Sequence, residues 1–368
     1  MSPFFDIPSL LLFLTIGLCM VLLIHYGSHN KKENLVVAAV ILLLFAVSRK
    51  VSYGLGGIDA ISYENIFLQR DFSRLIENNE FLFVWFTRFI RNFTDSPVVY
   101  RFFCYLLISF SYFFFIKEFL PRRSSSIPFL LVVYLYLLSF NTMRNSMAVA
   151  LILIGLTFLK KEIRFLSILF IISAVFVHRM SIVYVPFVLF YYLFKRNNQL
   201  ISKKAFIIFV VVSLSLSVVV GEAFQSYMMM AEALEGTDAY YIGANQGESF
   251  LSATALVVPL FLLAFFWIIA GNKQIAEEHR LLYLMIIYDI VIFPCTFIFG
   301  MWRANEYMYI PRLTMWAILI YSFCLKFAAS NRLFIKAIFL LSFIFWFIDR
   351  IEGSYIDAGL MPYVLDWF

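Results

Sequence analysis

The sequence predicts an all-α integral membrane protein, built as a polytopic bundle of about 12 transmembrane helices. Hydrophobic residues make up 63% of the 368 residues, and the mean hydropathy is +0.88. Charged residues make up 14%, whereas about a quarter is usual in a soluble domain. Long apolar runs recur along the whole chain, and such runs cross lipid as helices because a helix satisfies its own backbone hydrogen bonds.

The apolar runs divide the chain into twelve expected spans. The first run, Ile7–Ile24, has no basic residue before it and no cleavage site of small residues, so we expect a retained helix rather than a signal peptide. No internal repeat or low-complexity linker interrupts the chain, and we treat 1–368 as a single integral-membrane domain. The expected spans are 8–25, 35–48, 97–117, 127–142, 143–159, 164–178, 180–194, 204–221, 251–270, 281–300, 309–327 and 333–349.

Lysine and arginine in the short loops predict the orientation of these spans. The basic loops alternate so that they share one side of the membrane, and the positive-inside rule identifies that side as cytoplasmic. Both ends of the chain are then expected outside. The basic loops are 26–34, 118–126, 160–164, 195–204, 271–280 and 328–332.

Two external segments, about 48–95 and 222–250, are long enough to hold structure. The first contains EFLFVWFTRFIRNF, in which apolar and basic residues follow helical spacing, as in an interfacial or re-entrant helix. The second is acidic and contains Tyr240 and Tyr241. Tyrosine and carboxylates suit contact with a neutral sugar chain, although an ordinary solvated loop explains the same composition.

Arginine, and not lysine, is concentrated on the predicted outer side. A positive charge for orientation could come from either residue, but the planar guanidinium makes paired hydrogen bonds to phosphate or carboxylate. We therefore expect some outer arginines to bind an anionic substrate and others to anchor helices among headgroups. The candidates for substrate binding are Arg49, Arg144, Arg179, Arg303 and Arg312, and the candidates for anchoring are Arg88, Arg91, Arg101 and Arg350.

The stretch Asn141–Pro186 holds two apolar runs around a basic turn, Lys160–Arg164. Because the turn lies halfway between Arg144 and His178, an antiparallel helix pair would bring these two residues to one membrane surface. A neighbouring cation disfavours imidazolium, so His178 is expected to be largely neutral and able to accept a proton. A purely structural histidine at a helix end is the simpler interpretation.

Two other groups of polar residues have an open interpretation. Asp59 and Tyr63 lie one turn apart if GIDAISYENIF begins a helix, and Asp59 is then either a helix cap or a second candidate base facing the arginines. Arg312 lies slightly inside the membrane, where an arginine is costly without an anion. Its partner is either Glu306 or a substrate pyrophosphate.

Asp289 lies deep in the expected span 281–300. An intramembrane carboxylate raises the alternative of a proton-coupled transporter, but a single one is more often protonated and hydrogen-bonded to a neighbouring helix.

The sequence lacks the motifs of several chemistries. It has no phosphate loop, no dinucleotide fingerprint, no HExxH and no outer DxD pair, so we expect neither a cofactor nor a metal. The net charge of +6 comes from loops, which suits lipid headgroups or phosphates, and we expect no nucleic-acid partner. Four cysteines fall inside apolar runs without disulfide or zinc spacing, and we interpret them as small packing residues: Cys19, Cys104, Cys295 and Cys324.

At these residues the chain resembles the EpsG-like, Wzy-type polysaccharide polymerases of bacteria. The matching stretches are GGIDAISYENIF, MRNSMAVALILIGLTFLKK, FVHRMSIVYVP, an arginine-rich turn late in the chain, and Pro362-Tyr363. The resemblance carries over Arg144, His178, Asp59 and Tyr63. The assignment of Arg179, Arg303 and Arg312 depends on their expected position alone.

The resemblance implies polymerisation of glycan repeat units carried on undecaprenyl pyrophosphate, at the outer face of the bacterial inner membrane. It also implies a GT-C-like glycosyltransferase architecture, with the lipid-linked glycan and membrane lipids as partners and a chain-length regulator protein as a further candidate. In such a reaction arginines stabilise the pyrophosphate leaving group, and His178 or Asp59 takes a proton from the attacking sugar hydroxyl. The alternatives are an O-antigen ligase, a flippase for lipid-linked oligosaccharide, and a membrane acyltransferase.

Overall fold

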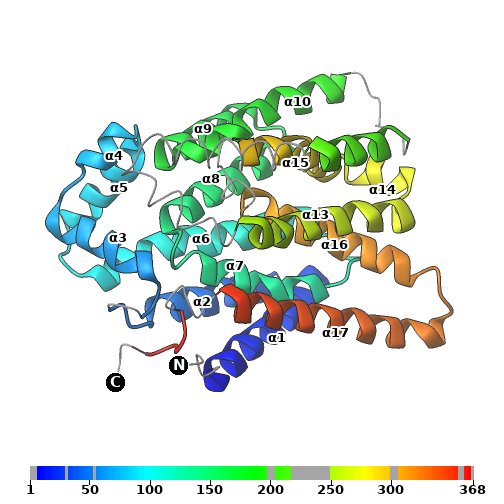
Figure 1. Ribbon diagram of the computed structural model, residues 1–368, viewed down its shortest axis with the longest axis horizontal. Coiled ribbons are helices and arrows are strands. Elements are labelled where there is room, and N and C mark those ends of the chain that lie inside the picture. The colour runs from blue at the N-terminus through cyan, green and yellow to red at the C-terminus, as the bar shows by residue number, and fades with distance from the viewer. Residues whose placement is uncertain are drawn as a thin grey trace. The chain divides into compact units, whose positions relative to one another are not determined.

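A computed structural model describes residues 6–29, 32–52, 55–196, 204–216, 249–298, 306–354 and 360–365 (Figure 1). The described chain is almost entirely helical, as the apolar runs predict. Its only extended pairings are two isolated bridges, Arg49 with Leu365 and Ser52 with Leu55. The all-α class is therefore confirmed for these residues.

The chain divides into two compact units. The first comprises Met1–Val185 and Leu313–Phe368, and the second comprises Pro186–Arg312. Helices of the first unit are α1 (Ile7–His29), α2 (Glu33–Val47), α3 (Ile58–Gln69), α4 (Ser73–Glu77), α5 (Phe81–Arg91), α6 (Pro97–Phe119), α7 (Val132–Leu138), α8 (Met143–Lys160), α9 (Arg164–Val177), most of α16 (Tyr309–Cys324) and α17 (Ala329–Ser354), with 3-10 helices η1 (Ile127–Leu131) and η2 (Arg179–Tyr184). The second unit holds α10 (Val185–Arg196) apart from its first residue, the helix Lys204–Leu216, α13 (Ser249–Ala270), α14 (Lys273–Glu278), α15 (Arg280–Ile298) and the start of α16.

Where the structure describes them, all the expected spans overlap helical structure, but several of these helices are too short to cross a membrane by themselves. Within the described residues, three stretches have the length and composition for it: Ile7–Gly27, Pro97–Phe119 and Met143–Lys160. Other apolar helices are shorter, such as Arg164–Val177 with 14 residues. The count of about twelve spans stays a prediction.

Helices α8 and α9 form a closely packed antiparallel hairpin. Glu162 takes a left-handed conformation (φ 61°) in the turn between them. Gly155 permits the close approach, because a Cβ atom there would lie 2.6 Å from Ile171 Cγ1 and 3.1 Å from the Ser167 carbonyl oxygen. Small residues allow helix backbones to approach in the same way in many membrane proteins. The hairpin brings the start of α8 beside the end of α9.

The segment expected to be external, about 48–95, is ordered into α3, α4 and α5. Helix α5 is amphipathic, as its sequence predicts: Phe83, Val84 and Ile90 are buried, whereas Phe81 and Trp85 are about half exposed or more. The second expected segment lies almost entirely outside the described residues.

The two ends of the described chain meet within the first unit. The backbone N–H of Tyr363 donates to Ser9 Oγ at 2.7 Å, and the Tyr363 ring stacks on Phe45 with a centroid distance of 4.7 Å. The backbone N–H of Lys50 donates to the Val364 carbonyl at 2.7 Å. Tyr363 and Val364 thus hold the end of α2 in place.

Candidate active site

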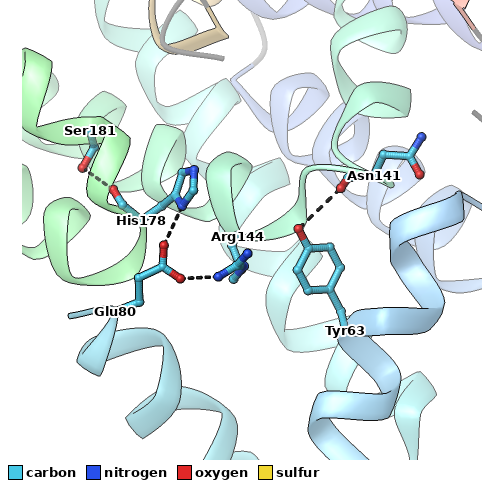
Figure 2. Close-up of polar contacts among 6 residues, drawn as sticks. All are labelled: Tyr63, Glu80, Asn141, Arg144, His178 and Ser181. Atoms are coloured by element: carbon cyan, nitrogen blue, oxygen red, sulfur yellow. Dashed lines mark hydrogen bonds and ion pairs between the residues drawn. The ribbon is translucent and has the colours of Figure 1, made fainter. Parts of the chain in front are cut away.

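A buried carboxylate, Glu80, joins Arg144 and His178 (Figure 2). Its Oε1 lies 2.8 Å from His178 Nδ1, and its Oε2 accepts a hydrogen bond from an Arg144 guanidinium nitrogen. The Glu80 side chain is 2% exposed, and the Arg144 and His178 side chains are 22% and 11% exposed. One carboxylate therefore binds a fixed cation and a titratable ring at the same time.

Three different elements position these side chains. Arg144 lies in the first turn of α8, and His178 directly follows the last residue of α9. The hairpin brings both to one end of the helix pair, as the sequence predicts. Glu80 immediately precedes α5, after a turn in which Asn79 takes a left-handed conformation (φ 60°).

His178 lies at the break between α9 and η2. Its backbone is extended (φ −153°, ψ 115°), and its N–H still donates to the Ala174 carbonyl at 2.9 Å. Its own carbonyl accepts from the Ser181 N–H at 3.0 Å and from Ser181 Oγ at 2.9 Å. These bonds redirect the chain, so the imidazole extends from the helix end toward Glu80 (Figure 2).

The electrostatics of the cluster favour an ionised Glu80. Burial by itself raises the pKa of this carboxyl. The His178 hydrogen bond, the Arg144 and His178 charges and the Arg179 backbone N–H together outweigh it, and they hold the pKa below its ordinary value. An ionised carboxylate only accepts hydrogen bonds, so His178 Nδ1 carries a hydrogen atom and its N–H donates a hydrogen bond to Glu80. The ring nitrogen that accepts a proton in the neutral form is then Nε2.

Sequence reasoning missed Glu80. The expected environment of His178 was set by the neighbouring cation Arg179, but the Arg179 side chain is exposed and its backbone N–H serves Glu80. A carboxylate beside the ring stabilises imidazolium, which opposes the expected effect of Arg179. The sequence feature that could have indicated Glu80 is its position as a carboxylate directly before an amphipathic helix in a segment expected to be external.

Arg144 has donors beyond the Glu80 contact. Its guanidinium carbon lies 5.7 Å from the centroid of the Tyr63 ring and 5.9 Å from that of Phe83. Its Nε is buried and has no hydrogen-bond partner among the described residues. Figure 2 shows Arg144 between Glu80 and Tyr63. The arrangement holds the arginine in place while leaving donor capacity for a further anion.

Asp59 and Tyr63 lie one turn apart in α3, as expected, but Glu80 is the carboxylate that binds Arg144 and His178. The Asp59 backbone N–H donates to Asn141 Oδ1 at 3.3 Å, and Tyr63 Oη donates to the Asn141 carbonyl at 3.4 Å. The N-cap residue of α3 is Gly57, so Asp59 does not cap this helix. Asn141 thus joins α3 to the chain that leads into α8.

The Arg49 guanidinium binds protein groups. The residue is 1% exposed, and it donates to the Gly56 carbonyl at 3.0 Å, the Ala46 carbonyl at 2.7 Å and Tyr105 Oη at 3.1 Å. The guanidinium carbon of Arg49 also lies 3.8 Å from the centroid of the Phe140 ring. These contacts fix the chain between α2 and α3, and they give Arg49 a structural use that the sequence did not predict.

Arg312 belongs to the second unit, where it binds Asp289. Its Nε and a terminal nitrogen donate to the two Asp289 oxygens at 2.6 and 2.8 Å, and both side chains are 3% exposed. The sequence suggested Glu306 or a substrate phosphate as the partner of Arg312, and a protonated state or proton coupling for Asp289. The bidentate pair explains both residues within the protein.

Of the other residues singled out in the sequence, some form ion pairs within the protein and some lie outside the described residues. Among the expected anchors, Arg101 pairs with Glu64 at 2.8 Å and Arg91 pairs with Asp95. Tyr240, Tyr241 and Arg303 lie outside the described residues. The described part of the chain contains no cluster of three or more His, Cys, Asp or Glu residues suited to a metal ion.

Comparison with known protein families identifies a match over most of the chain. A sequence model of the EpsG family matches residues 33–365, which is nearly the whole chain. No curated protein and no solved structure matches the sequence.

Proposed function

The chain belongs to the EpsG family of Wzy-like polysaccharide polymerases, and on that premise we propose that it polymerises glycan repeat units carried on undecaprenyl pyrophosphate. The reaction takes place at the outer face of the bacterial inner membrane and builds O-antigen, capsular polysaccharide or exopolysaccharide. The whole chain acts as one multi-pass membrane domain with a GT-C-like architecture.

The proposed step is a glycosyl transfer. The bond between the anomeric carbon of the growing chain and its lipid pyrophosphate breaks, and a bond forms to a hydroxyl at the non-reducing end of the incoming lipid-linked unit. The hydroxyl proton moves to a base on the protein, and the lipid pyrophosphate leaves with the electron pair. The leaving group is already good, so the protein mainly orients the two glycans and stabilises the developing charge.

The observation that carries the proposal is the Glu80 carboxylate shared by Arg144 and His178. Arg144 keeps a buried Nε without a partner in the described chain, which suits one pyrophosphate oxygen. Arginine supplies this charge without a metal. The exposed Arg179 side chain, next to His178, and the late residue Arg303 are further candidates for the same anion.

His178 is the proposed base. Glu80 holds Nδ1–H, which orients the ring and leaves Nε2 to take the proton from the sugar hydroxyl. The carboxylate then stabilises the imidazolium that forms. Asp59 remains the alternative base, and Tyr63 is proposed to contact the glycan beside Arg144.

One observation weakens the transporter alternative. Proton coupling was suggested by Asp289 as an isolated intramembrane carboxylate, but Asp289 forms a bidentate ion pair with Arg312 within the second unit. A carboxylate held in this way has its countercharge already in place.

The decisive experiment combines a purified assay with a deletion strain. With a lipid-linked repeat unit as substrate, His178→Ala should lower chain growth by roughly 10²–10⁴-fold and leave substrate binding nearly unchanged. Activity of His178→Gln would move the base assignment to Asp59, and Asp59→Asn tests that directly. In a strain without the gene, single repeats on core lipid support a polymerase. Absence of surface glycan supports a flippase, and polymer left on the carrier lipid supports a ligase.

A further inference from the structure

A groove of about 330 Å³ lies between α2 and α6 in the first unit. This volume is within the range of small-molecule pockets, about 300–1,000 Å³. The groove wall is apolar over most of its length and is formed by Leu35, Val36, Ala39, Phe110, Phe113 and Phe114.

Three charged residues complete the lining at one end of the groove. Lys32 and Glu33 lie at the start of α2, and Lys117 lies in the last turn of α6. The two helices run antiparallel, because Arg49, just beyond the other end of α2, binds Tyr105 in the first half of α6. The lining thus combines an apolar channel with a head of two cations and one carboxylate.

Lys32 and Lys117 differ in their contacts from Lys160 and Lys161, the two lysines at the end of α8. Lys160 donates to the Glu118 carbonyl, and Lys161 pairs with the Glu118 carboxylate at 3.0 Å. Lys32 and Lys117 are exposed and form no ion pair with any described residue. The charged end of the groove therefore holds two lysines and one carboxylate, Glu33, and carries a net positive charge.

The groove is remote from the candidate active site. Lys160 and Glu118 join the ends of α8 and α6, whereas Arg144 lies at the start of α8. The 18 residues of α8 correspond to about 27 Å at about 1.5 Å per residue. A ligand in the groove would not take part in glycosyl transfer.

We propose that this groove binds a membrane phospholipid with a zwitterionic headgroup that carries a primary ammonium. Lys32 and Lys117 bind the lipid phosphate, and Glu33 binds the ammonium group. An acyl chain lies along the aromatic side chains of α6. The two lysines match the two unesterified oxygens of a lipid phosphate, and Glu33 matches the ammonium, whereas a headgroup without an ammonium would leave Glu33 beside the phosphate without a cationic partner on the lipid.

Native mass spectrometry of the purified full chain tests the proposal, with phosphatidylethanolamine and phosphatidylglycerol supplied at equal concentration. The wild type should retain phosphatidylethanolamine preferentially. Lys32→Gln and Lys117→Gln should each lower its retention about fivefold, the factor that corresponds to about 1 kcal/mol per basic residue at a lipid surface. Glu33→Gln should remove the preference while retention of phosphatidylglycerol persists.

Lys336→Gln is the matched control, because Lys336 is an exposed lysine of α17 that does not line the groove. Its lipid retention should equal that of the wild type. Equal retention of the two lipids by the wild type would overturn the proposal, and so would retention of neither. This competition requires no variant, so it decides the matter even if a substituted protein fails to fold. Loss of retention in Lys336→Gln would also contradict it.

Discussion

Glu80 Oε1 and His178 Nδ1 lie 2.8 Å apart, although the two residues are 98 positions apart in the sequence. The contact joins the segment before α5 to the end of α9. It makes a residue outside the long apolar helices part of the candidate active site.

The first prediction concerns the charge of Glu80. Glu80→Gln keeps the side-chain shape but removes the negative charge that stabilises imidazolium, and it leaves one acceptor oxygen where the carboxylate offers one to His178 and one to Arg144. We expect chain growth to fall by roughly 10²–10⁴-fold, as for other losses of acid–base function. Glu77→Gln is the control, because Glu77 is an exposed residue of α4. The assay is incorporation of lipid-linked repeat units at matched protein amounts, and equal rates for both variants would contradict the assignment.

A second prediction follows from the lowered pKa of Glu80. A depressed folded-state pKa adds stability that is present above the ordinary glutamate value, about 4.3, and is lost as the pH falls through the folded value. The wild type should therefore unfold at a higher temperature than Glu80→Gln at pH 7. The difference should shrink as the pH falls below about 4.3. Thermal unfolding in detergent at several pH values measures this, and a constant difference would show that the charge of Glu80 is not responsible.

The third prediction concerns the geometry of Arg144. Lysine keeps the charge but has one nitrogen in place of the planar fork, so it cannot reproduce the geometry in which separate guanidinium nitrogens bind Glu80 and a pyrophosphate oxygen. We expect Arg144→Lys to lose most activity. Arg88→Lys should change activity little, because the exposed Arg88 lies over the Phe72 ring, 5.0 Å from its centroid. If both variants retain similar activity at equal expression, the phosphate-binding role of Arg144 is wrong.

The fourth prediction concerns the start of α3. Gly57 has φ 106°, and a Cβ atom there would lie 2.8 Å from Asn141 Oδ1 and 3.0 Å from the Phe140 carbonyl oxygen. Gly57→Ala should therefore destabilise the protein by about 1–3 kcal/mol, the usual cost of a strained backbone position. Ser62→Ala, at an exposed position of the same helix, should stay within about 0.5 kcal/mol of the wild type. Unfolding in denaturant measures the free energy of unfolding of the two variants. Similar values would show that a side chain at position 57 is tolerated despite the positive φ and the close approach of Asn141.

The fifth prediction concerns orientation. In a cysteine-free background, a cysteine at Asp71 should react with an impermeant reagent in intact cells, because 48–95 is expected outside. A cysteine at Lys161 should react only after the membrane is permeabilised. Reaction of position 161 in intact cells would show that the predicted orientation is wrong, and the Glu80 cluster would then lie on the cytoplasmic side.

Much of the local structure could be predicted from the sequence. Helices α6, α8 and α9 follow apolar runs whose ends are marked by Pro97, the Lys160–Arg164 turn and His178. The pairing of α8 with α9 follows from the short turn, and so does the placement of Arg144 near His178. These features depend on residues close in sequence, because hydrophobic length and turn chemistry are local properties.

The partners of the buried charges were decided only by the tertiary structure. Glu80 binds Arg144 and His178, Arg49 binds backbone carbonyls, and Arg312 binds Asp289. In each case a cation took a partner that the sequence did not indicate. A buried charge must be compensated by whichever polar group packing brings within hydrogen-bond distance, and that group comes from distant parts of the chain. The sequence by itself thus determined the helices and the two residues at the ends of the hairpin, and the packing of α5 against them supplied the carboxylate that joins the two.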